Sequence, residues 1–561
     1  MAEIIAKKIK VGDLFSESFQ FKIPYFQRPL SWRLDNFEAL FEDIYNAFTQ
    51  NQEEYFLGTI ILQEENDKVY YIIDGQQRLT ALLILLAVIR DNTDSEDLKN
   101  SIKKALYQEE DKYKNLPAAP RIKMWEDLAN LEDFIYKVGK TKDYLKEIAE
   151  RRIKYIDDKD PKYRLYEAIF LYNQKYKDIF QENKNSEGEF VKYLYNNVYV
   201  VYISTKDLPY AIQLFNVINT RGLPLTTADI LKAENLSLID ESERHTFSKK
   251  WREIENNIGR ENVEKVIEFI RTLKLKTKAK ASIYKEYNDL IFKKEILKRG
   301  KDFIIYFDKI SEIYRDYILE PDDLRVENKY KNLVKLMKEF IPFDDWVPPL
   351  ISYCEKFKES HLLKFLYALE RKTVIEWIVG FTPTKRILSL NKIIELIESK
   401  NNPEEVITEL NIPKDLKEEF KKKIDGKDFG SEDFAKYLLL RIDLEKWDPE
   451  NFSGYSGTIT IEHILPQNPS EKSEWVKIFT DKEREEWTNK IGNLVLLGRR
   501  KNSKARNYDF KEKKEAYFFK GGATPFKITE NIKNYKTWTT KELEERQNEL
   551  VGELLKLYFG D

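Results

Sequence analysis

Two short stretches of the chain place polar side chains where they could do chemistry. The first, "YIIDGQQRLTALL" (71–83), separates an apolar run typical of a strand from one typical of a helix by five polar or flexible residues: Asp74, Gly75, Gln76, Gln77 and Arg78. The first turn of a helix carries unpaired N–H groups and a partial positive charge, and glycine lets backbone approach a ligand closely. The junction therefore suits a phosphate, which Arg78 could hold through two parallel hydrogen bonds. The alternative is an ordinary Asp-Gly turn with solvated side chains.

Two further loops favour an anion site near this junction. "IPYFQRPLSW" places Gln27 and Arg28 beside prolines, and "NTRGLPL" places Asn219 and Arg221 in a loop with glycine and proline. Three arginines in short, rigid, apolar contexts indicate convergence on one anion. Each arginine taken alone is better explained by a surface ion pair or a helix cap.

The second stretch is "TITIEHILPQ" (458–467), which ends an alternating strand pattern with an acid and a histidine. A second short strand, "IGNLVLL", follows, with Asn493 and Asn502 nine residues apart. A neutral His463 could take a proton from water, and the hard oxygens of Glu462 and Asn502 suit Mg²⁺ or Mn²⁺. This pattern predicts a metal-dependent nuclease in which Asn493 holds the loop around the site. A lone histidine is more often a core residue, but the neighbouring acid and asparagines favour catalysis.

Basic residues gather after the second strand. They are expected to face phosphates, with a solvated helix face as the alternative; the main candidates for DNA binding are Arg499, Arg500, Lys501, Lys504 and Arg506, followed by Lys511, Lys513 and Lys514. A second basic run, "RTLKLKTKAK" (271–280), could add backbone contacts but is better explained as solvated.

The elements that must position these residues fall into several parts. Residues 1–236 mix strand patterns such as "EYFLGTIILQ" and "YLYNNVYVVYIS" with helical ones such as "NFEALFEDIYNAF", which predicts an α/β domain. The last helix of this part is expected to be capped by Thr226 or Thr227. Residues 237–445 show apolar spacings of three and four, which predict helices interrupted at "EPDD", "VPPL", "FTPTK" and "NNPEE". Residues 446–525 are expected to hold the strand-strand-helix nuclease domain and 526–561 a helical extension. The fold class is therefore multidomain α+β.

Composition limits the possible functions. The chain of 561 residues has 95 basic and 97 acidic side chains, so a nucleic-acid surface must be a local patch. The single cysteine, Cys354, excludes internal disulfides and cysteine-rich metal sites, and the three histidines are widely separated. No apolar run approaches the roughly 20 residues that a membrane span requires. We expect a cytoplasmic protein with no membrane association.

Taken together, these motifs resemble those of the GmrSD-type restriction endonucleases. The resemblance rests on "IPYFQRPLSW", "YFLGTIIL", "IIDGQQRLTALLIL" and "FNVINTRGLPLTTADILKAENL", and on the histidine-containing segment near the C-terminus. It implies a ParB/sulfiredoxin-like N-terminal domain in which the DGQQR residues bind and hydrolyse an NTP, with Gln27, Arg28, Asn219 and Arg221 nearby. Asn216 departs from the acidic residue expected in many relatives.

For the C-terminal part, the resemblance implies an HNH, or His-Me finger, nuclease with a ββα-metal fold. His463 would be the general base, Glu462 and Asn502 the metal ligands and Asn493 the structural asparagine. Many such sites carry aspartate in place of Glu462.

The expected function is an NTP-dependent, modification-dependent endonuclease of phage defence that cuts or nicks double-stranded DNA with Mg²⁺ or Mn²⁺, with a homodimer as a candidate assembly. GTP, UTP, ATP and CTP all remain candidates for the nucleotide, and the sequence does not specify the DNA modification. The alternatives are a ParB-type, NTP-dependent DNA-binding switch with a degenerate nuclease domain, and a nucleotide-dependent phosphotransferase.

Overall fold

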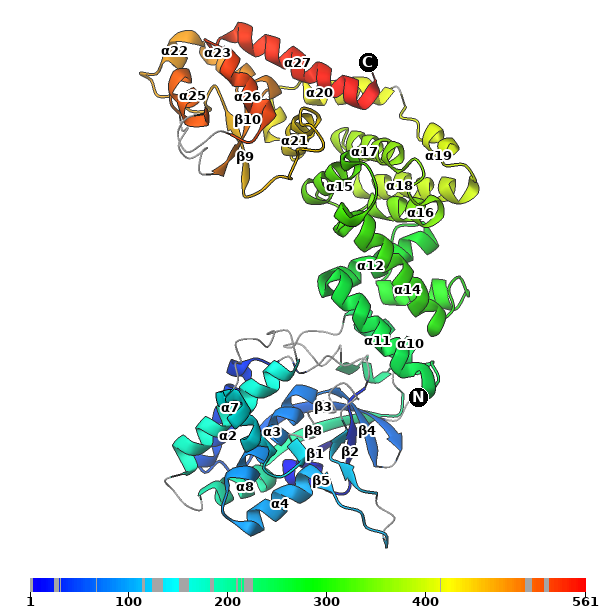
Figure 1. The fold of residues 1–561 in the computed structure, drawn as a ribbon, viewed down its shortest axis with the longest axis vertical. Helices are drawn as coiled ribbons and strands as arrows, with labels where there is room; N and C mark the ends of the chain where they lie inside the picture. The colour runs from blue at the N-terminus through cyan, green and yellow to red at the C-terminus, as the bar shows by residue number, and fades with distance from the viewer. Residues whose placement is uncertain are drawn as a thin grey trace. The chain divides into compact units, whose positions relative to one another are not determined.

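The computed structural model describes most of the chain, in two compact units, residues 1–249 and 250–561 (Figure 1). The described residues are 4–24, 30, 32–66, 68–113, 117–123, 135–150, 161–181, 186–207, 210–212, 214–215, 226–413, 415–499, 507–518 and 524–560.

The first unit is built on a six-stranded mixed sheet in the order β1-β8-β3-β4-β2-β7. Its strands are β1 (Ile5–Lys10), β2 (Gln20–Lys22), β3 (Tyr55–Asn66), β4 (Val69–Asp74), β7 (Ile122–Lys123) and β8 (Val198–Thr205). β3 pairs antiparallel with β4 and parallel with β8, and Asp74 at the end of β4 lies opposite Ile61. The predicted strand–helix junction therefore lies in the interior of the sheet, not at its edge.

Helix α3 (Gln76–Asn92) follows β4 directly and is the most buried element of this unit. All residues from Leu79 to Asp91 are buried, and α4 (Glu96–Leu106), α6 (Lys140–Glu150) and α7 (Pro161–Phe180) pack around it (Figure 1). A helix that is apolar on every face is stable only inside a core, which explains the uninterrupted run "LTALLILLAVI". Helices α2 (Leu34–Thr49) and α8 (Ser186–Asn196) add to the same core.

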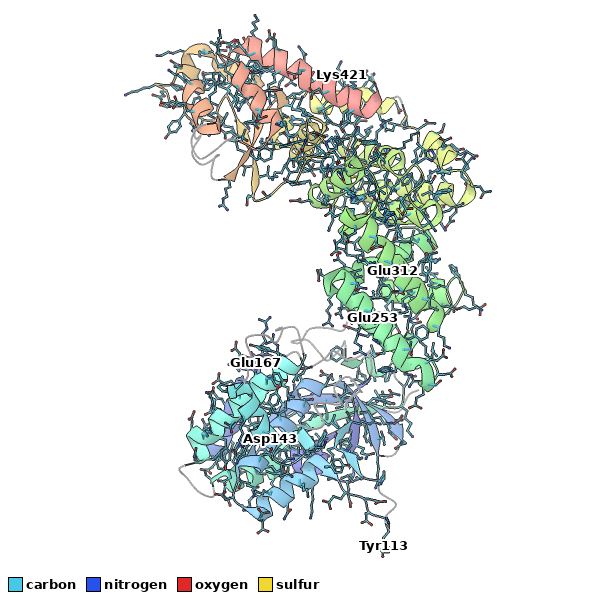
Figure 2. All side chains as sticks on the ribbon, in the orientation of Figure 1. Tyr113, Asp143, Glu167, Glu253, Glu312 and Lys421 are labelled. Atoms are coloured by element: carbon cyan, nitrogen blue, oxygen red, sulfur yellow. The ribbon has the colours of Figure 1, made fainter. Side chains whose placement is uncertain are left out.

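A short strand pair and one further helix also belong to this unit. β5 (Tyr107–Gln108) and β6 (Ala119–Pro120) form a small antiparallel pair, and Tyr113 between them projects fully into solvent (Figure 2). Helix α10 (Thr227–Ser237) begins at Thr226, whose hydroxyl accepts a hydrogen bond from the Asp229 amide at 3.2 Å, as the sequence predicts.

The second unit begins with helices, as predicted from the apolar spacing. The four expected interruptions all fall at helix boundaries, and Pro348 and Pro349 occupy the first turn of α16. The helices are α11 (Glu241–Ile258, across the boundary), α12 (Arg260–Leu275), α13 (Ile283–Glu286), η3 (Tyr287–Phe292), α14 (Lys301–Tyr314), η4 (Arg315–Leu319), η5 (Pro321–Asp323), α15 (Asn328–Phe340), α16 (Val347–Phe357), α17 (Leu362–Ile378), α18 (Pro383–Ser399), α19 (Pro403–Glu409), α20 (Asp415–Ile424), η6 (Phe429–Ser431) and α21 (Ala435–Glu445).

The C-terminal part of the second unit contains an antiparallel hairpin surrounded by helices. β9 (Ile459–His463) pairs with β10 (Leu494–Gly498), with His463 opposite Leu494. The surrounding helices are α22 (Glu474–Ile478), α23 (Asp481–Trp487), η7 (Ile491–Asn493), α25 (Phe510–Phe518), α26 (Lys527–Glu530), η8 (Asn531–Asn534) and α27 (Thr540–Phe559).

Residues 526–561 were expected to form a separate extension, but they complete the core of this hairpin. Trp538 and Leu543 are buried in one cluster with Ile464 and Val495. Arg546 of α27, 2% exposed, donates from Nη1 to the carbonyls of Gly492 and Leu494, at 2.6 and 2.8 Å. A boundary at residue 525 would therefore divide one core.

One predicted strand began too early. The pattern "YLYNNVYVVYIS" favours extended structure throughout, yet Tyr193 to Asn196 belong to α8 and the strand starts at Val198. The aromatic and leucine side chains of this segment fill the α8 core face, so helical packing outweighs their strand propensity. Among the described residues, no helix is long and apolar enough to cross a membrane.

The far end of α3 is fixed by a buried ion pair. Arg90, 1% exposed, donates to Asp91 Oδ1 at 2.8 Å and to the carbonyls of Ile135, Tyr136 and Lys137. Asp91 in turn accepts from the Thr141 amide and hydroxyl. Together these contacts fasten residues 135–141 to the helix.

We expect Arg90→Met to loosen this segment. It leaves Asp91 buried without its cation, a change that typically costs about 3–5 kcal/mol. Hydrogen–deuterium exchange of peptides covering 135–141 should speed up strongly, while the exposed control Lys104→Met should leave it unchanged. Unaltered exchange in Arg90→Met would show that the pair does not hold the segment.

Candidate functional site

The strand–helix junction depends on a glycine at position 75. Gly75 has a φ of 94° and caps the N-terminus of α3. A Cβ there would lie 2.5 Å from Ile60 Cγ2 of the neighbouring strand, so both the backbone conformation and the available space require glycine. Because Gly75 carries no side chain, the start of α3 can lie directly against Ile60 of β3.

Arg78 and Asp74 lie half-buried on either side of this turn. Arg78 Nη1 donates to the carbonyl of Thr59 at 3.0 Å, and its guanidinium packs against Gly58, where a Cβ would approach Nη1 to 2.9 Å. Burial lowers the pKa of Arg78, while the charges of Asp74 and Tyr55 oppose that shift. Burial also raises the pKa of Asp74, opposed by a backbone hydrogen bond from Gly75 and by Arg78.

Asp74 acts on the charge of Arg78 without forming an ion pair with it. Among the described residues, no carboxylate lies within ion-pair distance of Arg78. A half-buried cation held by a carbonyl beside a helix N-terminus is chemically suited to bind an anion.

The remaining residues predicted for this site are only partly described. Gln76 is buried, and Gln77 Oε1 accepts a hydrogen bond from the Trp32 amide at 3.2 Å, which brings the end of the "IPYFQRPLSW" segment to the junction. Five residues named from the sequence lie outside the described residues: Gln27, Arg28, Asn216, Asn219 and Arg221. The convergence of three arginines on one anion therefore stays a prediction.

In the second candidate site, His463 stands at the end of β9. It is half-buried, and its Nε2 lies 2.9 Å from Oδ1 of Asn489, in the loop between α23 and η7. Burial lowers the pKa of His463 below its ordinary value, while the hydrogen bond with Asn489 acts in the opposite direction. The lowered pKa favours the neutral imidazole, the form that accepts a proton. The sequence did not single out Asn489, because a polar loop residue gives no distinguishing signal.

Asn493 is fully buried and has structural contacts. Its Oδ1 accepts from the Leu465 amide at 2.7 Å, and its Nδ2 donates to the carbonyls of Leu465 and Thr488 at 2.9 and 2.8 Å. The turn after His463 is thereby tied to the start of β10. Trp538 Nε1, at 3.3 Å from Oδ1, adds a contact from the C-terminal segment.

Glu462 lies on the buried side of β9, away from solvent. Consecutive strand residues point to opposite faces, and Glu462 is only 7% exposed. Its Oε1 accepts hydrogen bonds from Lys513 Nζ at 2.7 Å and from the Tyr517 hydroxyl at 3.3 Å, both from α25. Lys513 Nζ also donates to the His463 carbonyl at 2.5 Å. Glu462 is thus held by a lysine in this structure, and its role as a metal ligand stays a prediction.

Some of the basic residues predicted to face phosphates have other contacts in the structure. Lys513, 1% exposed on its side chain, is a buried partner of Glu462 and not a phosphate-facing residue, and Lys514 donates to the carbonyls of Lys533 and Tyr535. Arg499 and Lys511 are exposed. In the second basic run, Arg271 is buried and paired with Glu286 at 2.6 Å. The other predicted DNA-binding residues, together with the metal ligand Asn502, lie outside the described residues; they are Arg500, Lys501, Lys504 and Arg506.

The donor set expected for a metal is therefore incomplete in the part of the chain that the structure describes. Within it, no group of three or more histidine, cysteine, aspartate or glutamate side chains is close enough to hold a metal ion. Glu462 offers the hard oxygen that Mg²⁺ or Mn²⁺ prefers, but Lys513 occupies one of its oxygens.

Two segments of the chain match models of a known family. Residues 11–236 match the N-terminal domain of the GmrSD restriction endonucleases, and residues 414–553 match the C-terminal domain of the same family. The chain belongs to the GmrSD-type family. The match confirms the resemblance, and membership implies nuclease activity with DNA as the substrate.

The GmrSD C-terminal domain extends beyond the predicted nuclease boundaries on both sides. Its match begins just before α20 and runs through most of α27, which agrees with the shared core of Trp538 and Leu543. A comparison with curated proteins found no match.

We expect Lys513→Met to destabilise the β9–β10 hairpin, because it leaves the Glu462 carboxylate buried without a cation. Loss of one partner of a buried pair costs about 3–5 kcal/mol, whereas replacing both partners is often close to neutral. The double variant Lys513→Met/Glu462→Gln should therefore recover much of the loss. Hydrogen exchange of peptides spanning β9 and β10 measures both; equal exchange in the single variant and the wild type would contradict a stabilising role.

Proposed function

We propose that this GmrSD-type protein cleaves or nicks DNA at an HNH, ββα-metal centre in which His463 is the general base. The observation that carries the proposal is the half-buried imidazole at the end of β9, which has Asn489 at Nε2 and no hydrogen-bond partner at Nδ1 among the described residues. The β9–β10 hairpin is joined to α25 through Lys513 and Tyr517, which gives a strand-strand-helix arrangement around the histidine. Asn493 keeps the loop after His463 in place.

A divalent cation, Mg²⁺ or Mn²⁺, is part of this proposal. Such an ion would stabilise the charge that develops on the scissile phosphate and on its leaving oxygen. Glu462 and Asn502 would hold it, which requires Lys513 to give up its contact with Glu462 or the ion to use the other carboxylate oxygen. The requirement is directly testable by adding and removing the metal.

The N-terminal site is proposed to bind and hydrolyse an NTP that controls cleavage. Gly75 lets α3 start directly against β3, and Arg78 in the first turn supplies a half-buried cation without an ion-paired carboxylate among the described residues. The two sites lie in separate compact units, so control would act through a change in the population of cleavage-competent states. The substrate is proposed to be modified double-stranded DNA, as in phage defence, and the protein a cytoplasmic one that acts as a monomer or homodimer.

One observation supports a second candidate function. The buried Lys513–Glu462 pair occupies a predicted metal ligand, as expected if the C-terminal domain had lost catalysis and the protein were a ParB-type, NTP-dependent DNA-binding switch. A plasmid-nicking assay with Mg²⁺ or Mn²⁺ separates the two: DNA binding without any strand cleavage would favour the switch.

We expect His463→Ala to lose DNA cleavage and to retain NTP hydrolysis, because the two sites share no residue. Proton transfer by a positioned side chain contributes about 10²–10⁴-fold to a rate, and the loss should fall in that range. Nicking of modified plasmid and phosphate release are measured on the same preparation. The matched control is His245→Ala, an exposed histidine of the first unit. Undiminished nicking by His463→Ala would remove the nuclease assignment to this residue.

Arg78→Ala is expected to abolish NTP turnover while the fold persists, because it removes the cation beside the helix N-terminus. Arg78→Lys should recover little, since an ammonium cannot form two parallel hydrogen bonds with phosphate. Phosphate release and equilibrium binding of each of the four NTPs are the measurements, with the exposed Lys104→Ala as the surface control. Normal hydrolysis in Arg78→Ala and in Asp74→Ala would mean that the junction is only a turn.

A further inference from the structure

The ring of His463 is held by a side chain that comes from outside its own strand. Asn489 lies 26 residues further along, between α23 and η7, and its Oδ1 is 2.9 Å from His463 Nε2. This is a hydrogen bond of ordinary length and the shortest polar contact of the ring among the described residues.

The direction of this hydrogen bond follows from a third residue. Gln467 Nε2, an amide nitrogen that can only donate, lies 3.2 Å from the same Oδ1. The Asn489 atom that faces His463 is therefore an acceptor, and Nε2 must carry the proton. Gln467 Nε2 is also 3.4 Å from His463 Nε2, a long contact that the shorter bond to Asn489 outweighs.

The backbone of Asn489 is itself fixed from a segment outside the hairpin. Gly430, in η6, donates its N–H to the Asn489 carbonyl at 2.7 Å. A Cβ on Gly430 would lie 3.1 Å from Leu494 Cδ1, 3.2 Å from the Asn489 carbonyl oxygen and 3.4 Å from Oδ1. The position of Asn489 thus depends on a close backbone contact with a turn that precedes α21.

We infer that Asn489 is a positioning residue that keeps His463 in the Nε2–H tautomer and so presents Nδ1 as the proton acceptor. In neutral imidazole one nitrogen donates and the other accepts, and the partner of the first determines which atom is the base. No described residue hydrogen-bonds to Nδ1. The inference rests on the proposed role of His463 as general base.

The step that this geometry supports is balanced in atoms and charge. A water molecule gives one proton to Nδ1 while its oxygen bonds to the scissile phosphorus, and the bond from phosphorus to the 3′-oxygen breaks. The 3′-alkoxide then takes a proton from solvent, and His463 returns its own proton to solvent. Asn489 forms and breaks no covalent bond; it contributes only orientation and the choice of tautomer.

The first test reads the tautomer directly and needs neither metal nor DNA. The chain has only three histidines, so selective ¹⁵N labelling of histidine rings, with His463→Ala to assign the signal, isolates His463. Wild type is expected to show a protonated Nε2 and an unprotonated Nδ1. Asn489→Ala should give a mixture of tautomers, and Asn489→Asp, which keeps an acceptor oxygen, should retain the wild-type form. The matched control is Asn468→Ala, an exposed asparagine on the loop that follows His463.

The second test is kinetic and uses the full chain. Asn489→Ala should lower kcat for nicking about 10- to 100-fold, a part of what proton transfer contributes, with KM within about twofold. Asn489→Asp should restore most of the rate, which loss of a merely structural contact would not predict. An Nδ1–H tautomer in the wild type, or a normal kcat in Asn489→Ala, would overturn the inference. Failure of the proposed function itself appears differently, as undiminished cleavage by His463→Ala with the tautomer unchanged in wild type.

Discussion

The complete burial of α3 is the constraint on which the first unit depends. A helix that is apolar on all faces must be enclosed, and here the sheet and helices α4, α6 and α7 enclose it. Its polar residues can then lie only at its ends. At one end the Arg90–Asp91 pair ties down residues 135–141, and at the other Gly75 and Arg78 contact β3. The candidate anion site is therefore a consequence of the core, because no other part of this helix can carry polar chemistry.

The second unit solves a related problem by pairing polar groups inside the core. Asn493 satisfies both ends of its amide within one turn, and the carboxylate of Glu462 is met by Lys513 and Tyr517. Buried polar groups are costly unless each has a partner, so these contacts specify one arrangement of the β9–β10 hairpin. His463 differs from these groups because one of its ring nitrogens has a partner and the other has none among the described residues. A proposed general base needs such a ring nitrogen without a partner, and the neighbouring buried groups have none.

The sequence predicted those elements that depend on local patterns. The cap at Thr226, the helix starts marked by proline and the strands ending at Asp74 and His463 all follow from spacing and composition over a few residues. It did not predict that Lys513 is buried, because a lysine beside other basic residues looks solvated until its carboxylate partner, 51 positions away, is known. Arg271 misleads in the same way, since its partner Glu286 lies on the next helix. Asn489 could not be found for a different reason: its role depends on a 2.9 Å contact across a loop, and no local pattern encodes such a distance.

These long-range contacts also explain why the C-terminal segment belongs with the hairpin. Trp538 contacts Asn493, Arg546 donates to two carbonyls at the start of β10, and Gln547 accepts from the Gly492 amide. Gly492 leaves no room for a side chain, because a Cβ there would lie 2.8 Å from the Leu543 carbonyl. The segment that carries Asn489 and Asn493 thus contacts both β9 and α27, and Gly430 donates a hydrogen bond to its backbone. Three segments distant in the sequence therefore determine where one imidazole points, and a change in any of them should reach His463 through this loop.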